Sequence, residues 1–389
     1  MSTQSTTAPV PEQSFWKRLS LRFDARSYTM ILALVVIWLI FTVLTEGRFL
    51  IPRNLSNLSR QMSITAVLAI GMVMVIVATH IDLSVGSVLG LTGGIAAVLQ
   101  VWYHWETPWV ILAAVALGAL IGAWHGFWVA YQKVPAFIVT LAGYMAYRGI
   151  LLGVLKGLTV APMFPSFKII SSGYLDLLPG VILVTVSILA LVIGRFRSRA
   201  AKLRYGFQVR PLVLEILQVL FYCALIILAT YTLYQYEGIP YPVILVLILT
   251  LIFAFITNNT KFGRQVYAMG GNVEAARLSG INVRRRTMVV FILASVLASI
   301  AGVLTTARLN AATITAGTGA EMDAIASCVI GGTSLMGGVG NIPGAIIGAL
   351  VMASLDNGMS MMNTEAFWQF IIKGFILLLA VWVDIKTKK

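Results

Sequence analysis

The chain has 389 residues, of which 59% are apolar and only 11% charged, and its mean hydropathy is +0.91. A water-soluble chain carries roughly 25% charged residues, so this composition excludes an ordinary soluble protein. The net charge of +14 would suit a nucleic-acid-binding protein, but the cations cluster in loops between long apolar runs. The sequence therefore predicts an integral membrane protein with no nucleic-acid partner.

About twelve apolar runs approach the ~20 helical residues that cross a bilayer. The first run is followed by the polar segment TEGR at 45–48 and not by a small-residue cleavage site, so we expect an uncleaved span. Two stretches, near 82–100 and 322–341, are rich in Gly, Ser and Thr and are predicted to be broken or short helices, which neighbouring helices must bury. The predicted fold class is an all-α polytopic transmembrane bundle, with runs at 29–45, 61–79, 84–103, 108–130, 134–155, 175–194, 212–234, 241–257, 287–307, 322–336, 343–360 and 366–383.

The distribution of cations predicts the orientation of the spans. With the N-terminus inside and strict alternation, the inside segments hold twenty Lys and Arg against five in the outside loops, in agreement with the positive-inside rule. We expect a cytoplasmic segment at 1–28, a transmembrane domain at 29–385 and a cytoplasmic tail at 386–389. The loop at 46–61, with three arginines outside, is an exception.

The basic loop at 258–286 contains its own helix signals. Asn272 can cap a helix, Glu274 stands in the first turn where the helix dipole favours an acid, and Gly280 can end the helix in a left-handed conformation. The predicted helix, 273–279, is too short to be stable alone. It therefore needs a partner surface.

One face of this helix is narrow, with Val273, Ala276 and Gly280 close together, and it would fit a groove in another protein. On another face Glu274 and Arg277 can pair at i and i+3. The alternative is a solvated basic loop that only keeps this side of the protein in the cytoplasm.

The segment EAARLSG at 274–280 resembles the coupling motif of ABC importer permeases, in which a short cytoplasmic helix docks on the ATPase subunit. The similarity to permeases for ribose, xylose and related monosaccharides covers most of residues 30–385. It extends to FGRQVYAMGGN (262–272), IDLSVGS (81–87), VPAFIVTLAG (134–143) and EMDAIASCVIGGTSLMGGVG (321–340). Within the group, ASLDNGMSMM (353–362) and WQFIIKGFILLLAVWVD (368–384) are most similar to the xylose permeases.

This resemblance implies a transport subunit and not an enzyme. It implies a homodimer of permeases in the bacterial inner membrane, a periplasmic sugar-binding protein, and a partner ATPase that holds ATP and Mg, so that this chain carries no cofactor. The residues that it implies for ATPase coupling are Asn272, Glu274, Ala275, Ala276 and Gly280.

Compared with ribose-type permeases, which resemble a ten-span core, residues about 172–237 look like an inserted pair of spans. A basic loop, RFRSRAAKLR, joins the two. Xylose-type permeases resemble this chain in the extra length, which favours xylose over ribose as the expected substrate.

The Gly-rich segment GGTSLMGGVGNIPG at 331–344 fits no nucleotide-binding motif. It lacks the lysine of a phosphate-binding loop, so we expect the ATPase to be another chain. His80, His104 and His125 lack the spacing of metal ligands on one helix, and no metal site is predicted.

Acidic residues in apolar surroundings are functional candidates because charge in hydrocarbon is costly. Asp82, with the nearby Ser84, precedes one small-residue helix, and Glu321 and Asp323 precede another. We predict that they line the translocation pathway, where carboxylates accept hydrogen bonds from sugar hydroxyls. The alternative is that they cap the helices.

Further features remain open at this level. Trp124 and Trp128, one helical turn apart, are additional pathway candidates, and Lys373 could pair with Asp356 or extend toward an interface. DLSVGSVLGLTGG and DAIASCVIGGTSL share Gly and Thr at equal offsets, which suggests an internal repeat of the kind found in transporters.

Two rival functions are compatible with the pattern. One is an ion-coupled secondary transporter that uses the same acids as a proton or sodium path; it does not explain a capped helix in a basic loop. The other is an ABC permease of the same architecture for another sugar or for branched-chain amino acids.

Overall fold

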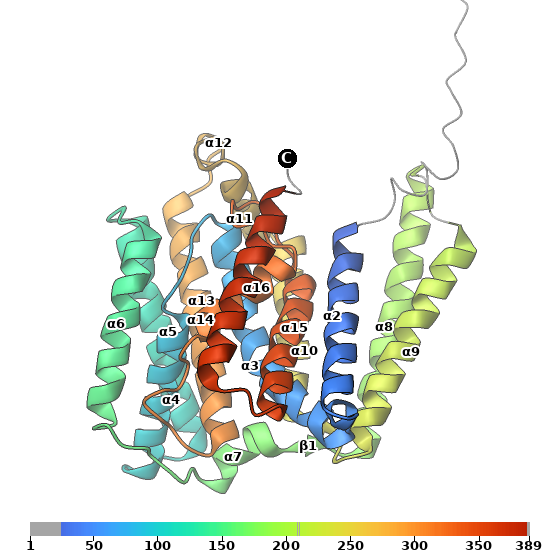
Figure 1. Cartoon of the computed structure of the whole chain (residues 1–389). Coiled ribbons are helices and arrows are strands. Elements are labelled where there is room, and N and C mark those ends of the chain that lie inside the picture. Colours follow the sequence, from blue (N-terminus) through green and yellow to red (C-terminus); the bar gives the residue numbers. More distant parts are fainter. Residues whose placement is uncertain (1–24, 208, 210, 387–389) are drawn as a thin grey trace, which may run out of the picture.

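The computed structural model describes residues 25–207, 209 and 211–386. Most of the predicted N-terminal segment, 1–28, and of the tail, 386–389, lies outside these residues. The described chain is a bundle of helices (Figure 1). The elements are α2 (Ala25–Leu44), η1 (Arg48–Leu50), α3 (Pro52–Val77), α4 (Val85–Val101), α5 (Thr107–Ala130), α6 (Ala136–Val154), α7 (Pro165–Ser172), β1 (Tyr174–Leu175), α8 (Leu177–Arg204), α9 (Leu212–Tyr234), β2 (Ile239–Pro240), α10 (Tyr241–Asn259), α11 (Lys261–Gly271), α12 (Val273–Leu278), α13 (Val283–Leu309), α14 (Ala320–Ile330), α15 (Ile342–Met361) and α16 (Ala366–Lys386).

Each of the twelve predicted apolar runs overlaps one of these helices, so the all-α fold class is confirmed. Within the described residues, eight helices are long and apolar enough to cross a membrane: α3, α5, α6, α8, α9, α10, α13 and α15. Shorter apolar helices lie at Met30–Leu44, Val85–Val101 and Ala366–Trp382. The number of membrane crossings remains a prediction.

The most extensive contact between two helices of the described chain is that between α5 and α13. Gly118, Gly122 and Gly126, four residues apart, lie on one stripe of α5, and an added Cβ on each would come within 2.5–2.8 Å of α13 atoms. Glycines at this spacing let two helix backbones approach closely, which replaces the missing hydrophobic driving force between helices in lipid. The helices α3 and α4 also pack against α13.

The helices α8 and α9 lie at the edge of the bundle (Figure 1). They contact each other, and α9 contacts α3, but only 6% of each apolar span is buried. The strands β1 and β2, which flank the pair in the sequence, form two antiparallel pairings, Tyr174 with Pro240 and Leu175 with Ile239. The chain therefore leaves the main bundle and returns to it at nearly the same place.

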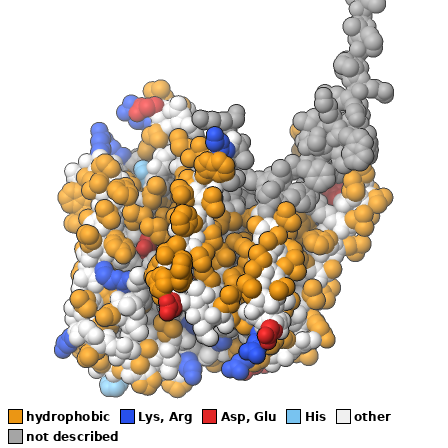
Figure 2. All heavy atoms as spheres, viewed as in Figure 1, with side chains coloured by type: hydrophobic (Ala, Val, Ile, Leu, Met, Phe, Trp, Pro, Cys, Tyr) orange, Lys and Arg blue, Asp and Glu red, His pale blue; other side chains and the backbone are white. Residues whose placement is uncertain are grey.

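The surface has the distribution of side chains expected for a bilayer. Hydrophobic side chains cover most of the face in Figure 2, and most Lys and Arg side chains lie toward its upper and lower ends. The exposed apolar residues of α16, such as Phe367, Phe375 and Trp382, would be unfavourable in water. A bilayer removes that cost.

The helix α14 has only 11 residues, about 16 Å at 1.5 Å per residue, which is about half of the hydrocarbon thickness. The prediction of a short helix here is confirmed. The suggested internal repeat is not reflected in the local structure, because Gly90 and Thr92 lie inside α4 whereas Gly331 follows the end of α14 and Thr333 lies in the loop.

Candidate functional site

The helix α12 has the end structures that the sequence predicts. The Asn272 side chain accepts a hydrogen bond from the Ala275 backbone N–H at 2.9 Å, and the helix runs over Val273–Leu278. Gly280 has φ +81°, in the left-handed region, which a residue with a side chain rarely adopts. These local features place the start, the end and the exit direction of the helix.

The outward face of α12 differs from the prediction. Ala276 is only 4% exposed and packs within its own chain, so it is not part of a surface for another protein. Leu278, which the sequence interpretation did not select, is 83% exposed. An apolar side chain this exposed at the tip of a capped helix is a candidate contact with a partner. In the sequence, the only indication of this role for Leu278 was its position at the end of the segment EAARL.

Glu274 and Arg277 form the predicted pair, with 2.8 Å between Oε2 and Nη2. Each side chain is 68% exposed, so the pair contributes only about 0.3–0.5 kcal/mol to the helix. Both charges remain available to an incoming surface.

The preceding helix, α11, seats this unit on the bundle. Gly270 touches the end of α3 and the Gly-rich loop 331–341, because a Cβ built on it would lie 1.8 Å from the Val77 carbonyl oxygen and 2.4 Å from the Gly338 nitrogen. The Tyr267 hydroxyl donates to the Gly340 carbonyl at 2.7 Å. Burial raises the pKa of the Tyr267 phenol, which keeps the proton on the donor. The Gly-rich loop, unexplained by sequence motifs, is thus a close-packing surface.

Inside the bundle, Asp82 is fully buried between α3 and α4. Its Oδ1 accepts hydrogen bonds from the Ser84 N–H at 2.8 Å and the Ser84 hydroxyl at 2.6 Å, and its Oδ2 has no partner in the structure. Asp82 does not occupy the cap position of α4, which is Ser84, but it accepts the Ser84 N–H just before the helix, as the capping alternative expects of a carboxylate there. Asp82 holds the turn before the helix.

Two further buried groups lie near Asp82. The Tyr147 hydroxyl is 3.0 Å from His125 Nε2, and both residues interact electrostatically with Asp82. This polar cluster joins α5, α6 and the segment before α4. Among the described residues, no group of three or more His, Cys, Asp or Glu could hold a metal ion.

Glu321 is brought to the start of α4. It is 5% exposed, and a Cβ on Gly86 would lie 2.2 Å from its Oε2. The two segments that the sequence selected for their acids therefore meet, although 239 positions separate Asp82 from Glu321. Arg148 of α6 supports the approach by donating to the carbonyls of Ile314 at 3.0 Å and Ala316 at 2.8 Å.

Asp323 takes part in a separate network. Lys373 Nζ lies 2.8 Å from Asp323 Oδ1 and 3.0 Å from Asp356 Oδ1. The predicted pair of Lys373 with Asp356 is thus present and extended by Asp323. Gly319 occupies the cap position of α14, and the Glu321 carboxylate is hydrogen-bonded to backbone groups of Gly319 and Glu321, as the capping alternative expects. Both acids stand in the first turn, where the helix dipole favours them.

In the described part of the chain, Trp124 and Trp128 make no hydrogen bond or ring contact with these acids. Trp124 lies about 200° around α5 from Gly122, so it faces away from α13, and it is 56% exposed. Its ring is 5.5 Å from that of Trp128 in an edge-to-face arrangement. Their pathway role remains a prediction.

A bundle of long apolar helices with buried carboxylates inside it defines a multi-pass membrane protein. The chain belongs to the family described as branched-chain amino acid transport system / permease component, whose model matches residues 54–381.

Individual relatives are similar over nearly the whole chain. The xylose transport system permease protein XylH of Haemophilus influenzae is 49% identical over 93% of this chain and 96% of its own. The protein of the same name from Escherichia coli K12 is 50% identical over 93% and 92%. The ribose import permease protein RbsC of E. coli K12 is 37% identical over 92% and 93%. No solved structure gives a significant match. The relatives are named as transport permeases, and this chain is a transport subunit and not an enzyme.

Proposed function

We propose that this chain is the membrane-spanning subunit of an ABC importer that carries a monosaccharide, xylose, into the bacterial cytoplasm. The observation that carries the proposal is the identity of about 50% with xylose transport permeases over 93% of the chain. The lower identity of 37% with the ribose import permease favours xylose over ribose.

In this proposal α12 docks on a partner ATPase, which holds ATP and Mg. The support is structural: a capped helix with exposed Leu278, Glu274 and Arg277 stands on a seat made by α11. Movement of α12 would reach the bundle through both neighbouring helices: through α11, which packs on α3 and the loop 331–341, and through α13. Because the backbones of α11 and the loop 331–341 are in contact, a displacement of α11 must also displace the loop.

The proposed orientation places α12 and the described end of α16 in the cytoplasm of an inner-membrane protein. Both lie at the same end of the bundle (Figure 1). A periplasmic sugar-binding protein would deliver xylose to the opposite end, and a second copy of the chain would complete the pathway. The helices α8 and α9 are proposed as an inserted pair, 172–237, that leaves the core topology unchanged and faces lipid.

The test is reconstitution of the permease with its ATPase in liposomes, with the sugar-binding protein outside. We expect accumulation of xylose that requires ATP and is unaffected by excess ribose or leucine. Uptake by the permease alone, driven by a pH or sodium gradient, would contradict the proposal and establish the secondary-transporter alternative. If excess leucine or ribose inhibited xylose uptake, the competing solute would replace xylose as the assigned substrate.

Removing the α12 cap is expected to weaken binding of the ATPase. Asn272→Ala loses the bond to the Ala275 N–H, which costs about 1 kcal/mol, or roughly a fivefold drop in affinity. The measurement is titration of the ATPase onto the permease in nanodiscs. Asn282→Ala is the matched control: Asn282 caps α13 through the Arg285 N–H at 3.0 Å, but bundle packing holds that 27-residue helix. Equal losses for the two variants would refute a specific role for the α12 cap.

A further inference from the structure

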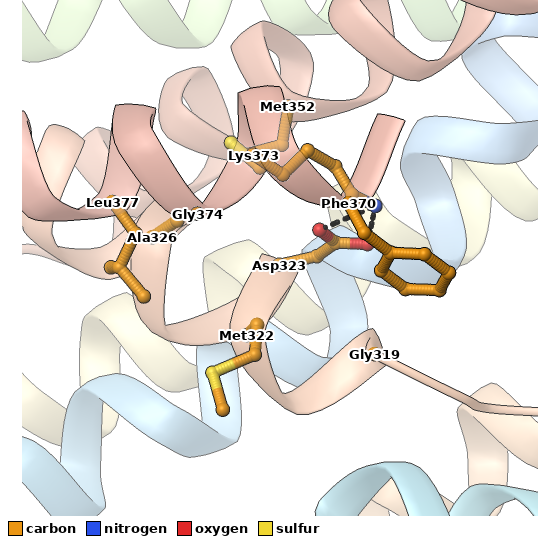
Figure 3. A pocket seen from close by; sticks show the side chains of 9 residues that line it. All are labelled: Gly319, Met322, Asp323, Ala326, Met352, Phe370, Lys373, Gly374 and Leu377. Carbon is orange, nitrogen blue, oxygen red and sulfur yellow. Dashed lines mark hydrogen bonds and ion pairs between the residues drawn. The ribbon is translucent and has the colours of Figure 1, made fainter. Parts of the chain in front are cut away.

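A cavity of about 250 Å³ lies between α14, α15 and α16 (Figure 3). Most of its wall is apolar, including Met322, Met352 and Phe370, and its charged members are Asp323 and Lys373. Figure 3 shows the Phe370 ring beside the Asp323–Lys373 ion pair. Phe370 is 56% exposed and Met322 44% exposed, so the cavity opens to the surface of this chain.

The ion network at this cavity has more hydrogen-bond acceptors than donors. Lys373 offers three N–H donors, whereas the carboxylates of Asp323 and Asp356 offer about four acceptor sites each. All four carboxylate oxygens lie 2.8–3.3 Å from the single ammonium group. The network therefore has a net charge of −1 and acceptor capacity that no donor in it can fill.

This balance selects the chemistry of a ligand. An anion would be repelled by the net negative charge, and an apolar chain would fit the apolar wall but offer no donor to the acceptor sites of Asp323. A cation would compete with Lys373 for the same oxygens. A neutral polyol offers hydroxyl donors for Asp323, oxygen acceptors for Lys373, and a C–H face for Phe370.

We propose that this cavity is a monosaccharide subsite on the transport pathway. Sugar hydroxyls donate to the Asp323 carboxylate, a sugar oxygen accepts from the Lys373 ammonium, and the ring packs on Phe370. Asp356, which does not line the cavity, lies 3.0 Å from Lys373 Nζ and positions it. The volume is just below the ~300 Å³ at which pockets for drug-sized ligands begin, which suits a single sugar unit. The inference rests on the proposed function and adds a binding site for the sugar within the transport pathway.

Gly374 allows the cavity to be filled without disturbing the fold. It lines the cavity, and a Cβ built on it meets nothing within 4 Å. Gly374→Leu therefore adds volume where there is space, and it favours the helix because Leu is a better helix former than Gly. Gly194→Leu is the matched control, since Gly194 also has no atom within 4 Å of its added Cβ and lies on α8, outside the cavity lining.

In reconstituted transporter we expect Gly374→Leu to lower ATP-driven xylose uptake about tenfold, while the variant still co-purifies with the ATPase and its ATP hydrolysis continues. Gly194→Leu is expected to retain uptake. If Gly374→Leu transports xylose as well as Gly194→Leu does, the subsite is refuted while the importer function stands. If the unsubstituted transporter moves no xylose, the proposed function itself fails.

A labelling experiment measures occupancy directly and does not depend on transport. Gly374→Cys and Gly194→Cys are made in a Cys223→Ser background; the remaining Cys328 is fully buried. We expect xylose to slow the reaction of a small neutral thiol reagent at position 374 and not at position 194, in the nucleotide-free complex. Equal rates with and without xylose at position 374, or equal protection at both positions, would overturn the proposal. This result also decides the case in which Gly374→Leu fails to assemble.

Discussion

Replacing Gly270 by alanine is expected to lower ATP-driven uptake by about tenfold or more, because the added methyl group has no space between α11 and the bundle. Its Cβ would lie 1.8 Å from the Val77 carbonyl oxygen and 2.4 Å from the Gly338 nitrogen. Both are backbone atoms, so no side-chain rotation relieves the overlap. The helix α11 must move away from α3 and the loop 331–341, and α12 moves with it.

The neighbouring glycine provides the control. Gly271 belongs to the same helix, but its added Cβ meets nothing within 4 Å. Alanine is the better helix former by about 1 kcal/mol, so Gly271→Ala should retain uptake and lose no stability. Uptake is compared at equal amounts of membrane-inserted protein. Hydrogen exchange of the backbone amides of 261–271 measures whether α11 remains packed on α3 and the loop 331–341. Unchanged uptake and exchange in Gly270→Ala would show that this contact does not transmit movement.

The second large effect is expected at Leu278. Leu278→Asp should weaken ATPase binding roughly thirtyfold, or about 2 kcal/mol, the typical cost of losing a central apolar contact and burying a charge in its place. The side chain is 83% exposed in the isolated chain, so the membrane fold should be unaffected. The measurement is ATPase affinity together with the yield of folded permease.

Leu309→Asp is the control, because it makes the same substitution far from α12. Leu309 is the last residue of α13, about 40 Å along that helix from Val283, the residue nearest α12. Leu309 is 49% exposed, and its variant should bind the ATPase normally. Leu278→Met should do the same, since it keeps an apolar side chain of similar size. If Leu278→Asp binds like Leu309→Asp, the docking surface does not include the tip of α12.

The helix α12 illustrates what sequence interpretation can and cannot predict. The start and end of α12 could be predicted because Asn272 acts three residues away and Gly280 acts on its own backbone. Which face of α12 points outward could not, because Ala276 is buried by packing against other parts of the chain. The prediction that Ala276 faces a partner failed for this reason, and Leu278 was missed.

The intramembrane acids show the same division. Their presence in apolar runs marked Asp82, Glu321 and Asp323 as candidates, and the backbone hydrogen bonds that Asp82 and Glu321 accept at the helix starts are local. Lys373 reaches Asp323 across 50 positions in the sequence. A network of this kind depends on the packing of α14, α15 and α16, and neither helix propensity nor hydrophobic pattern contains that information.

The sequence by itself determined the apolar helices, the ends of α12 and the resemblance to sugar permeases, since these depend on composition and on residues within about one helical turn of each other. Tertiary structure alone decided that Gly270 is a seat, that Leu278 is the exposed tip, and that Asp323 and Lys373 border a cavity. Each of these properties requires an atom from a distant part of the chain, and only close packing of helices brings such atoms together.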